Sequence, residues 1–280
     1  MTTLRYRQDG YFRANRRDNL GKNYITNNLG QLTRIALPPE VVVTAYSNTY
    51  SLLFDGVNEY LECGSANELA FDYNQPFSIS VWLKPTGFQS SDNIVSRHNS
   101  NVGWSLGLDV NGQLRFRLFA IPATKEITAR SVAVMTTGSW QHVFATFDGT
   151  AAAGNMKIYR NNVLLSTDYT LNNLGTTTTI PVGTVRTRIA QNAEAAQLYK
   201  GYMDELAIWN KELTSSDRSE IYNSGAPNNL LSVAAASNLV GWWRMGDGVD
   251  AFPTFFDYST NNNSGSAQNM EAGDITGSAP

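Results

Sequence analysis

The 280-residue chain has little cysteine, histidine or charge: one Cys, two His, and 16% charged residues. A single cysteine excludes an intrachain disulfide, and one cysteine with two histidines cannot form a standard zinc site. Hydrophobic residues make up 42% of the chain, a balance that excludes a disordered chain and a coiled coil. No apolar run reaches the roughly 18–20 residues of a membrane-spanning helix. Stability must therefore come from an ordinary hydrophobic core.

The basic residues are concentrated at the start of the chain. Seven basic and two acidic side chains fall within the first 34 residues, whereas the whole chain has a net charge of −3. This stretch lacks apolar periodicity, so residues 1–50 are predicted to form an extended basic arm. Two interpretations stay open: a solvated terminus, or an arm that docks on an acidic partner surface. The docking side chains would be Arg5, Arg7, Arg13, Arg16 and Arg17.

The first residues, Met1 to Arg7, have no apolar run behind their charges, so no secretory signal peptide is expected. The protein is expected to stay where it is made or to leave the cell as part of a particle. The negative net charge gives no reason to expect nucleic-acid binding. Because the chain also lacks a long apolar run, no membrane partner is expected.

Period-two alternation of apolar and polar residues begins near Val41 and predicts strands with one buried face. In the segment 77–83, Phe77, Ile79, Val81 and Leu83 fall on one side. One short helix is predicted, with Thr214 as its N-cap, Asp217 completing a capping box, and Gly225 and Pro227 ending it. Many short strands and one helix predict an all-β antiparallel sandwich.

Five segments, in this order, resemble the laminin-G-like members of the concanavalin A-like lectin/glucanase superfamily. They are Leu53–Gly56 with Glu59–Leu61, Phe77–Pro85, Trp140–Val143 with Phe147–Gly149, Lys157–Asn162, and Gly201–Asn210. The resemblance implies a jelly roll over residues 51–225, with variable loops on one rim and on the concave face.

The tail resembles the segment that normally opens this family, in Leu239–Gly248 and Asp257–Gly265. A sandwich without its opening strand would have an unpaired edge, which proteins avoid. Residues 226–280 are therefore predicted to supply an additional strand, either to the same chain, as in a circular permutation, or to a neighbouring subunit. The alternative is a small cap that packs separately.

No carboxylates are spaced as glycoside hydrolysis requires. Asp204 and Glu205 are adjacent, so on a regular strand they would point to opposite faces and could not share a substrate. The sequence also has no nucleophile elbow, phosphate loop or dinucleotide fingerprint. No enzymatic activity is predicted.

Two sets of residues are candidates for ligand or metal binding. Arg97, His98 and Asn99 lie in a polar stretch before Trp104, and such a stretch beside an aromatic suits a sugar. The resemblance implies a structural calcium site near the first and last strands, where the matching residues are Asp55 and Asp204. No other cofactor is expected. Most aromatic residues fall at inward strand positions, although aromatics that stack on sugar rings would give the same pattern.

The tail segments Gly241–Gly248 and Asn269–Ala272 also resemble laminin-G-like proteins of marine tailed bacteriophages. This implies a non-catalytic virion structural protein, a capsid decoration or a tail-fibre component, made in the host cytoplasm and displayed on the virion surface. The arm would bind other virion proteins, the chain would form a homo-oligomer, and the sandwich could bind a surface glycan weakly. The alternatives are a bacterial surface or secreted carbohydrate-binding module and a glycoside hydrolase.

Overall fold

The computed structural model describes residues 46–280 except 91, 99–101, 121–124, 151, 173–184 and 193–197, together with the backbone of five short strands before residue 46. The chain divides into two compact units, residues 1–45 and 46–280. Within the described part, no helix is long and apolar enough to cross a membrane.

The first unit contains two small antiparallel sheets. Strands β1 (Arg7–Gln8) and β2 (Tyr11–Phe12) form one, and β3 (Arg16–Arg17), β4 (Asn23–Thr26) and β5 (Leu32–Arg34) form the other. Arg7, Arg16 and Arg17 of the predicted docking set lie in these strands, whereas Arg5 and Arg13 lie outside the described residues. Local strand pairing thus replaces a wholly extended arm, and the docking role stays a prediction.

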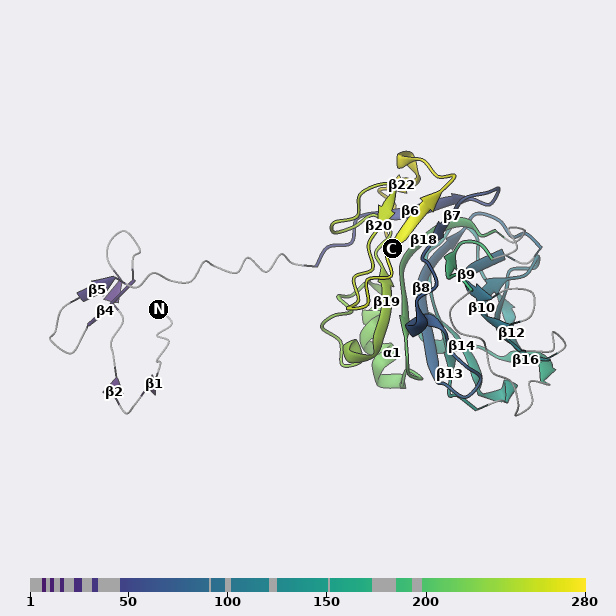
Figure 1. The fold of residues 1–280 in the computed structure, drawn as a ribbon, viewed down its shortest axis with the longest axis horizontal. Helices are drawn as coiled ribbons and strands as arrows, with labels where there is room; N and C mark the ends of the chain where they lie inside the picture. The colour runs from purple at the N-terminus through teal and green to yellow at the C-terminus, as the bar shows by residue number, and fades with distance from the viewer. Residues whose placement is uncertain are drawn as a thin grey trace. The chain divides into compact units, whose positions relative to one another are not determined.

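The second unit is a sandwich of two antiparallel sheets (Figure 1). The nine-stranded sheet has the order β16 (Thr167–Asn172), β12 (Lys125–Val134), β11 (Gln113–Ala120), β10 (Gly103–Leu108), β9 (Asp92–His98), β17 (Arg188–Ile189), β7 (Tyr60–Glu62), β21 (Gly265–Gln268) and β20 (Thr254–Phe255). The eight-stranded sheet has the order β15 (Val163–Leu164), β14 (Met156–Arg160), β13 (Gln141–Phe147), β8 (Phe77–Pro85), β18 (Lys200–Trp209), β6 (Ser51–Asp55) and β22 (Ile275–Thr276), and β19 (Leu239–Trp243) also pairs with β18.

The core between the sheets follows the alternation in the sequence. On β8, Phe77, Ile79 and Val81 are fully buried in the main cluster, and Trp104 and Leu106 of β10 join them from the opposite sheet. This arrangement confirms the predicted all-β sandwich.

The tail completes both sheets within the same chain. Strand β19 pairs with β18, β21 pairs with β7, and β22 pairs with β6. Both indole rings of Trp242 and Trp243 are buried. Residues 226–280 therefore contribute several strands to the sandwich.

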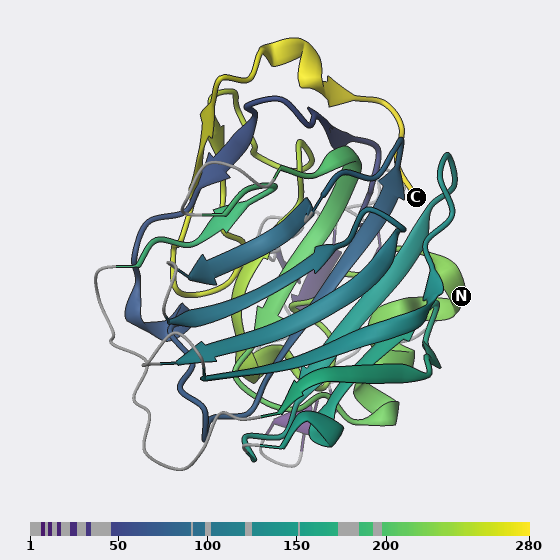
Figure 2. The same ribbon diagram turned by 90° about the vertical axis from the view of Figure 1, so that its right-hand side faces the viewer.

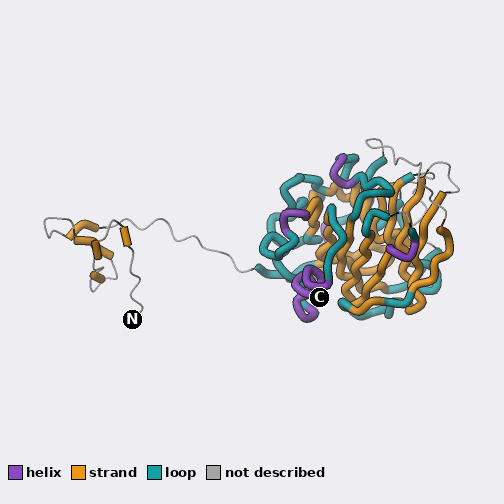
Figure 3. Tube along the Cα trace, turned by 90° about the horizontal axis from the view of Figure 1, so that it is seen from below, coloured by secondary structure: helices purple, strands orange, loops and turns teal. Residues whose placement is uncertain are grey.

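Helix α1 (Ser215–Tyr222) covers part of the outer face of the eight-stranded sheet. Its N-cap Thr214 forms the predicted capping box with Asp217. Ile221 packs with Phe144, Trp209 and Leu230 in a second cluster on that face. The 3₁₀ turns η1 (Asn67–Leu69), η2 (Ala153–Asn155), η3 (Asn223–Gly225), η4 (Ala236–Asn238) and η5 (Ala272–Asp274) lie around the strands (Figure 3).

The outer face of the nine-stranded sheet is turned toward the viewer in Figure 2, and the described helix α1 lies behind the sandwich in that view. The two outer faces therefore differ: one carries α1 and its apolar cluster, and the other carries the polar side chains of β7 and β9–β12.

The boundary of the arm lies at residue 45 rather than residue 50. Residues 46–50, which we call the junction segment, belong to the sandwich unit because buried acidic side chains bind them. The predicted division at 50/51 is corrected accordingly.

Candidate functional site

A cleft of about 350 Å³ lies at the end of the sandwich where β8 begins and β18 ends. Its walls come from η1, from the turn that leads into β8, and from the residue after β18. The lining residues are Asn67, Glu68, Ala70, Phe71, Gln75, Pro76 and Asn210. A volume of this size lies within the range of small-ligand sites. We call it the rim cleft.

The lining of the rim cleft combines amide groups, a carboxylate and a ring. Asn67, Gln75 and Asn210 are exposed. The Gln75 Oε1 atom accepts a hydrogen bond from Asp72 N (2.8 Å), and Asn210 Oδ1 accepts one from Asn238 Nδ2 (2.9 Å). Because these amide oxygens are bonded within the protein, the amide nitrogens are the groups left to donate to a ligand. The Glu68 carboxylate supplies an acceptor.

Two of the predicted ligand residues hold the wall of this cleft from behind. Trp104 is fully buried, and its Nε1 donates to the carbonyl of Leu69 (2.9 Å), the last residue of η1. Arg97 is 3% exposed and donates from Nη2 to the carbonyl of Ser65 (3.2 Å). Burial lowers the pKa of Arg97 to about 10, with the charge of Glu68 acting in the opposite direction. These side chains position the wall and do not face a ligand.

Phe71, the aromatic residue of the cleft lining, packs against aromatic rings of the core. Phe71 stacks on Phe77 with ring centroids 4.5 Å apart and lies 6.1 Å from the Trp104 ring. Phe71 is itself 4% exposed, and both of these neighbours are fully buried, so this part of the wall is rigid and presents little of its ring to the cleft.

His98 lies elsewhere, on the outer face of the nine-stranded sheet. It is 6% exposed, and its ring stacks on Phe119 of β11 at 4.8 Å. Asn99 lies outside the described residues. The structure therefore does not bring the four predicted ligand residues together in one site.

Sequence reasoning missed the residues that line the rim cleft. Asn67, Gln75 and Asn210 lie in connections between strands, and only the fold brings residues 67–76 beside residue 210. The available signal was local: polar amides beside Phe71 and Pro76 immediately before a strong strand.

The two predicted calcium ligands are far apart. Asp55 is paired in register with Lys200, and Asp204 lies four residues further along β18, a separation of about 13 Å. Asp55 is exposed and accepts a hydrogen bond from Val57 N within its own turn, whereas Asp204 is fully buried. They cannot share one ion. Among the described residues, no group of three or more His, Cys, Asp or Glu side chains could hold a metal.

A β-bulge in β18 places two acidic residues differently from the sequence expectation. Asp204 pairs with Trp82 and Ala207 pairs with Ser80, so β18 has one residue more than β8 between these pairs. Glu205 takes up the extra position with a left-handed φ of 48°. The expectation of opposite faces was wrong, because it assumed a regular strand: the junction segment binds both carboxylates.

Glu205 is at the centre of this cluster. Its carboxylate accepts hydrogen bonds from Tyr46 Oη (2.8 Å), Trp242 Nε1 (2.5 Å) and Arg244 Nε (3.2 Å). Asp204 accepts one from Asn48 Nδ2 (2.8 Å), and Asp247 Oδ2 accepts the backbone N–H groups of Thr49 and Tyr50. We call this set the junction clasp.

Burial dominates the titration of the clasp. It raises the pKa of Glu205 to about 7, against the lowering effect of Arg244 and the three hydrogen bonds. Burial and the nearby Glu205 charge raise the pKa of Asp204 well above its usual value. The pair therefore retains a proton at neutral pH, on Asp204, because Glu205 faces the guanidinium.

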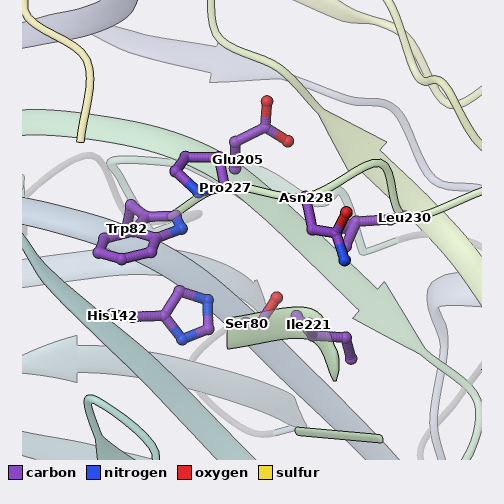
Figure 4. Close-up of a pocket in the computed structure, with 8 residues that line it drawn as sticks. All are labelled: Ser80, Trp82, His142, Glu205, Ile221, Pro227, Asn228 and Leu230. Carbon is purple, nitrogen blue, oxygen red and sulfur yellow. The ribbon is translucent and has the colours of Figure 1, made fainter. Parts of the chain in front are cut away.

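A small cavity of about 10 Å³ lies between the outer face of the eight-stranded sheet and the chain that follows α1. It is lined by Ser80, Trp82, His142, Glu205, Ile221, Pro227, Asn228 and Leu230 (Figure 4). Burial lowers the pKa of His142 to about 3, and no described residue forms a hydrogen bond with its Nδ1 atom or with Ser80 Oγ. In Figure 4 the Glu205 carboxylate points away from the imidazole. Serine, histidine and glutamate do not form a connected catalytic triad here, and the cavity holds no more than a water molecule.

Comparison with known proteins supports the fold. The model of the concanavalin A-like lectin/glucanases superfamily (laminin G type) matches residues 55–217. No curated protein sequence matches the chain. A structure from Bacteroides ovatus, of a protein assigned to carbohydrate binding, has a TM-score of 0.58 and 16% identity, covering 82% of this chain and 60% of that one. The chain thus spans 60% of the length of that protein.

Two further similar structures have lower scores. A heptameric SAP-like pentraxin from Limulus polyphemus has a TM-score of 0.45 and 18% identity, covering 62% of this chain and 82% of the pentraxin. Domain 4 of a GH43 extracellular arabinanase from Geobacillus stearothermophilus, in complex with arabinotriose, has a TM-score of 0.43 and 18% identity, covering 77% and 83%.

Proposed function

The chain belongs to the concanavalin A-like lectin/glucanase superfamily, and from this premise we propose that it is a non-catalytic carbohydrate-binding protein whose ligand occupies the rim cleft. The observation that carries the proposal is the lining of that cleft. Exposed amides, one carboxylate and the exposed ring of Pro76 offer donors, an acceptor and an apolar surface in one place. A sugar presents the complementary set, with hydroxyl groups around its edge and C–H groups on its face.

The positions of the acidic residues support binding rather than hydrolysis. On the outer face of the nine-stranded sheet, Glu62 of β7 and Glu126 of β12 are five strand spacings apart, about 24 Å. Glycoside hydrolysis needs two carboxyl groups within about 5–10 Å. Glu205 has its carboxylate occupied by three donors of the junction clasp.

The test is calorimetric titration of the purified chain with a panel of neutral oligosaccharides. For any member that binds, Asn67→Ala should weaken affinity about tenfold, because it removes one amide whose side chain forms no hydrogen bond with the described residues. Gln268→Ala is the matched control and should bind normally, because it alters an amide on β21 that bonds Ser266 and lies outside the rim cleft.

Two results would refute the proposal: no panel member binding at millimolar concentration, or equal affinity for Asn67→Ala and the unaltered chain. Release of reducing sugar from a bound glycan would refute its non-catalytic part.

We also propose the finer role of a virion structural protein that displays this sandwich, as a decoration or tail-fibre component at the virion surface. The supporting observation is the basic N-terminal region, which forms a compact unit of its own and could contact acidic virion proteins. Mass spectrometry of purified particles should find the chain in multiple copies, consistent with a homo-oligomer. Deleting residues 1–45 should abolish incorporation. Incorporation of the shortened chain would refute the docking role, and absence from particles would favour an exported bacterial module.

A further inference from the structure

The outer face of the nine-stranded sheet carries three arginines on two neighbouring strands. Arg115 and Arg117 alternate on β11 with Leu114, Phe116 and Leu118, whose side chains are buried in the core. Arg115 is paired directly with Arg130 of β12. Directly opposite residues have Cβ atoms about 5 Å apart, and like charges in such pairs are destabilising. Two arginines therefore occupy directly opposite positions on the outer face of the sheet.

The carboxylates nearby do not resolve this conflict. Glu126 bonds Arg117 Nε (2.8 Å), and Asp168 lies 3.8 Å from Arg130 at an exposed position. Within the described part of the chain, the Arg115 guanidinium forms one hydrogen bond, a long one from Nη2 to the carbonyl of Leu108 (3.4 Å).

Two more carboxylates lie in the neighbourhood, and their own loops bind them. Asp109 accepts the backbone N–H groups of Asn111 and Gln113, and Asp92 accepts that of Gln89. Burial, followed by the charge of Arg117, lowers the pKa of Arg115 even though Asp109, Glu126 and Asp92 act in the opposite direction.

The Nε–H groups of Arg115 and Arg130 are both buried from solvent, and neither has a hydrogen-bond partner among the described residues. A buried donor without a partner costs about 1–3 kcal/mol, so such a group in a native protein calls for an acceptor. On the other side of β11, β10 places Gly107 and Ser105 opposite Arg115 and Arg117, so no long side chain from that strand competes for the guanidinium groups.

From these contacts we propose that Arg115 and Arg130 form a second binding site, distinct from the rim cleft, for the carboxylate of an acidic saccharide. A planar carboxylate can bind the two terminal Nη groups of a guanidinium in a bidentate arrangement, which needs no access to the buried Nε atoms, and it adds a negative charge between the two arginines. The saccharide part of the assignment rests on the proposed carbohydrate-binding function.

The test is calorimetric titration of the full chain with trigalacturonate, with its fully methyl-esterified form, and with acetate. The acid should bind at least tenfold more tightly than the ester, and its affinity should fall as salt is added. Arg115→Gln and Arg130→Gln should each reduce the affinity for the acid to that for the ester. Lys200→Gln, which removes an exposed positive charge from β18, is the matched control and should leave binding unchanged.

A spectroscopic measurement covers the case in which a substitution unfolds the protein. In the unaltered chain labelled with ¹⁵N-arginine, the Nε–Hε resonances of Arg115 and Arg130 should shift on addition of trigalacturonate. The same resonances should stay in place on addition of the ester.

Equal affinity for acid and ester, or unchanged affinity in both Gln variants, would overturn the proposal. Binding of acetate as tight as that of trigalacturonate would overturn its saccharide part. If neutral sugars bind in the rim cleft but Arg115→Gln leaves the affinity for trigalacturonate unchanged, the arginine site alone is refuted. If the acid binds through Arg115 while no neutral sugar binds, the rim cleft alone is refuted.

Discussion

Glu205 shows how one backbone position changes the chemistry of a strand. Its left-handed φ inserts an extra residue in β18, and the two adjacent carboxyl groups then reach the same junction segment. The sequence could not reveal this, because a bulge depends on the partner strand as well as on the residue itself. The sequence also singled out Trp104 and Arg97, but it could not show that they lie behind the wall of the rim cleft, because that position depends on how the strands pair.

Replacing each of the two carboxyl groups of the junction clasp, those of Asp204 and Glu205, with an amide should change the stability of the protein by different amounts. Asp204→Asn should leave the free energy of unfolding at pH 7 within about 1 kcal/mol, since Asp204 is already protonated there. The amide oxygen can accept from Glu205 N, and the amide nitrogen can donate to Asn48 Oδ1, which has no partner among the described residues, once the Asn48 amide turns over. Glu205→Gln should cost about 3 kcal/mol, because both carboxyl oxygens of Glu205 accept hydrogen bonds and the amide nitrogen of glutamine would replace one of these acceptors with a donor. Urea denaturation of the two variants measures both values, and equal losses would contradict the assignment of the proton.

The pH dependence follows from the same raised pKa. The folded Glu205 carboxyl binds its proton more tightly than the unfolded one, so its contribution is full below about pH 4.5 and is lost as the pH rises through about 7. The free energy of unfolding of the unaltered chain should therefore fall between pH 5 and pH 8, and less so in Asp204→Asn. A flat profile in the unaltered chain would contradict this.

At the scale of elements, the sequence predicted what depends on local pattern. The alternation on β8 and the capping box of α1 are both present, because each is decided by residues a few positions apart. The rim cleft was missed because its residues come from positions 67–76 and 210, which only the pairing of β8 with β18 brings together. The order of strands around β7 was likewise out of reach of local pattern.

Strand β19 offers a sharp test of packing. A Cβ added at Gly241 would lie 2.6 Å from Cη2 of Trp243, a fully buried ring whose Nε1 donates to the carbonyl of Asn263. Gly241→Ala should therefore cost about 2 kcal/mol, because the indole cannot move aside. Thermal and urea denaturation measure the loss.

The control for this substitution is Gly273→Ala. A Cβ at Gly273 meets no atom within 4 Å, so the substitution should change stability by less than about 0.5 kcal/mol. Similar losses of stability in the two variants would show that the Trp243 side chain moves to accommodate the added methyl group.

At the scale of the whole molecule, the chain consists of two units with different compositions. The sandwich unit contains both sheets, their clusters and the junction clasp. The first unit contains the basic residues that the sequence singled out. The boundary between them is fixed by hydrogen bonds to acidic side chains of the sandwich and was not visible as a change in composition.

Two truncations separated by five residues should behave differently. Deleting residues 1–45 should leave the melting temperature of the sandwich within about 2 °C, because every part of its core is retained. Deleting residues 1–50 removes the donors that bind Glu205, Asp204 and Asp247, and should lower the melting temperature by about 10 °C. Differential scanning calorimetry measures both, and equal melting temperatures would place the boundary elsewhere.

Strand pairing in the sandwich also has a consequence for synthesis. Strand β6 lies between β18 and β22, and β7 lies between β17 and β21, so all four neighbours are translated more than a hundred residues later. At roughly 5–20 residues per second, the ribosome needs on the order of ten seconds to supply the first of them. During that time the nascent chain presents two strands with both edges bare, which is the form that chaperones bind and that aggregates recruit.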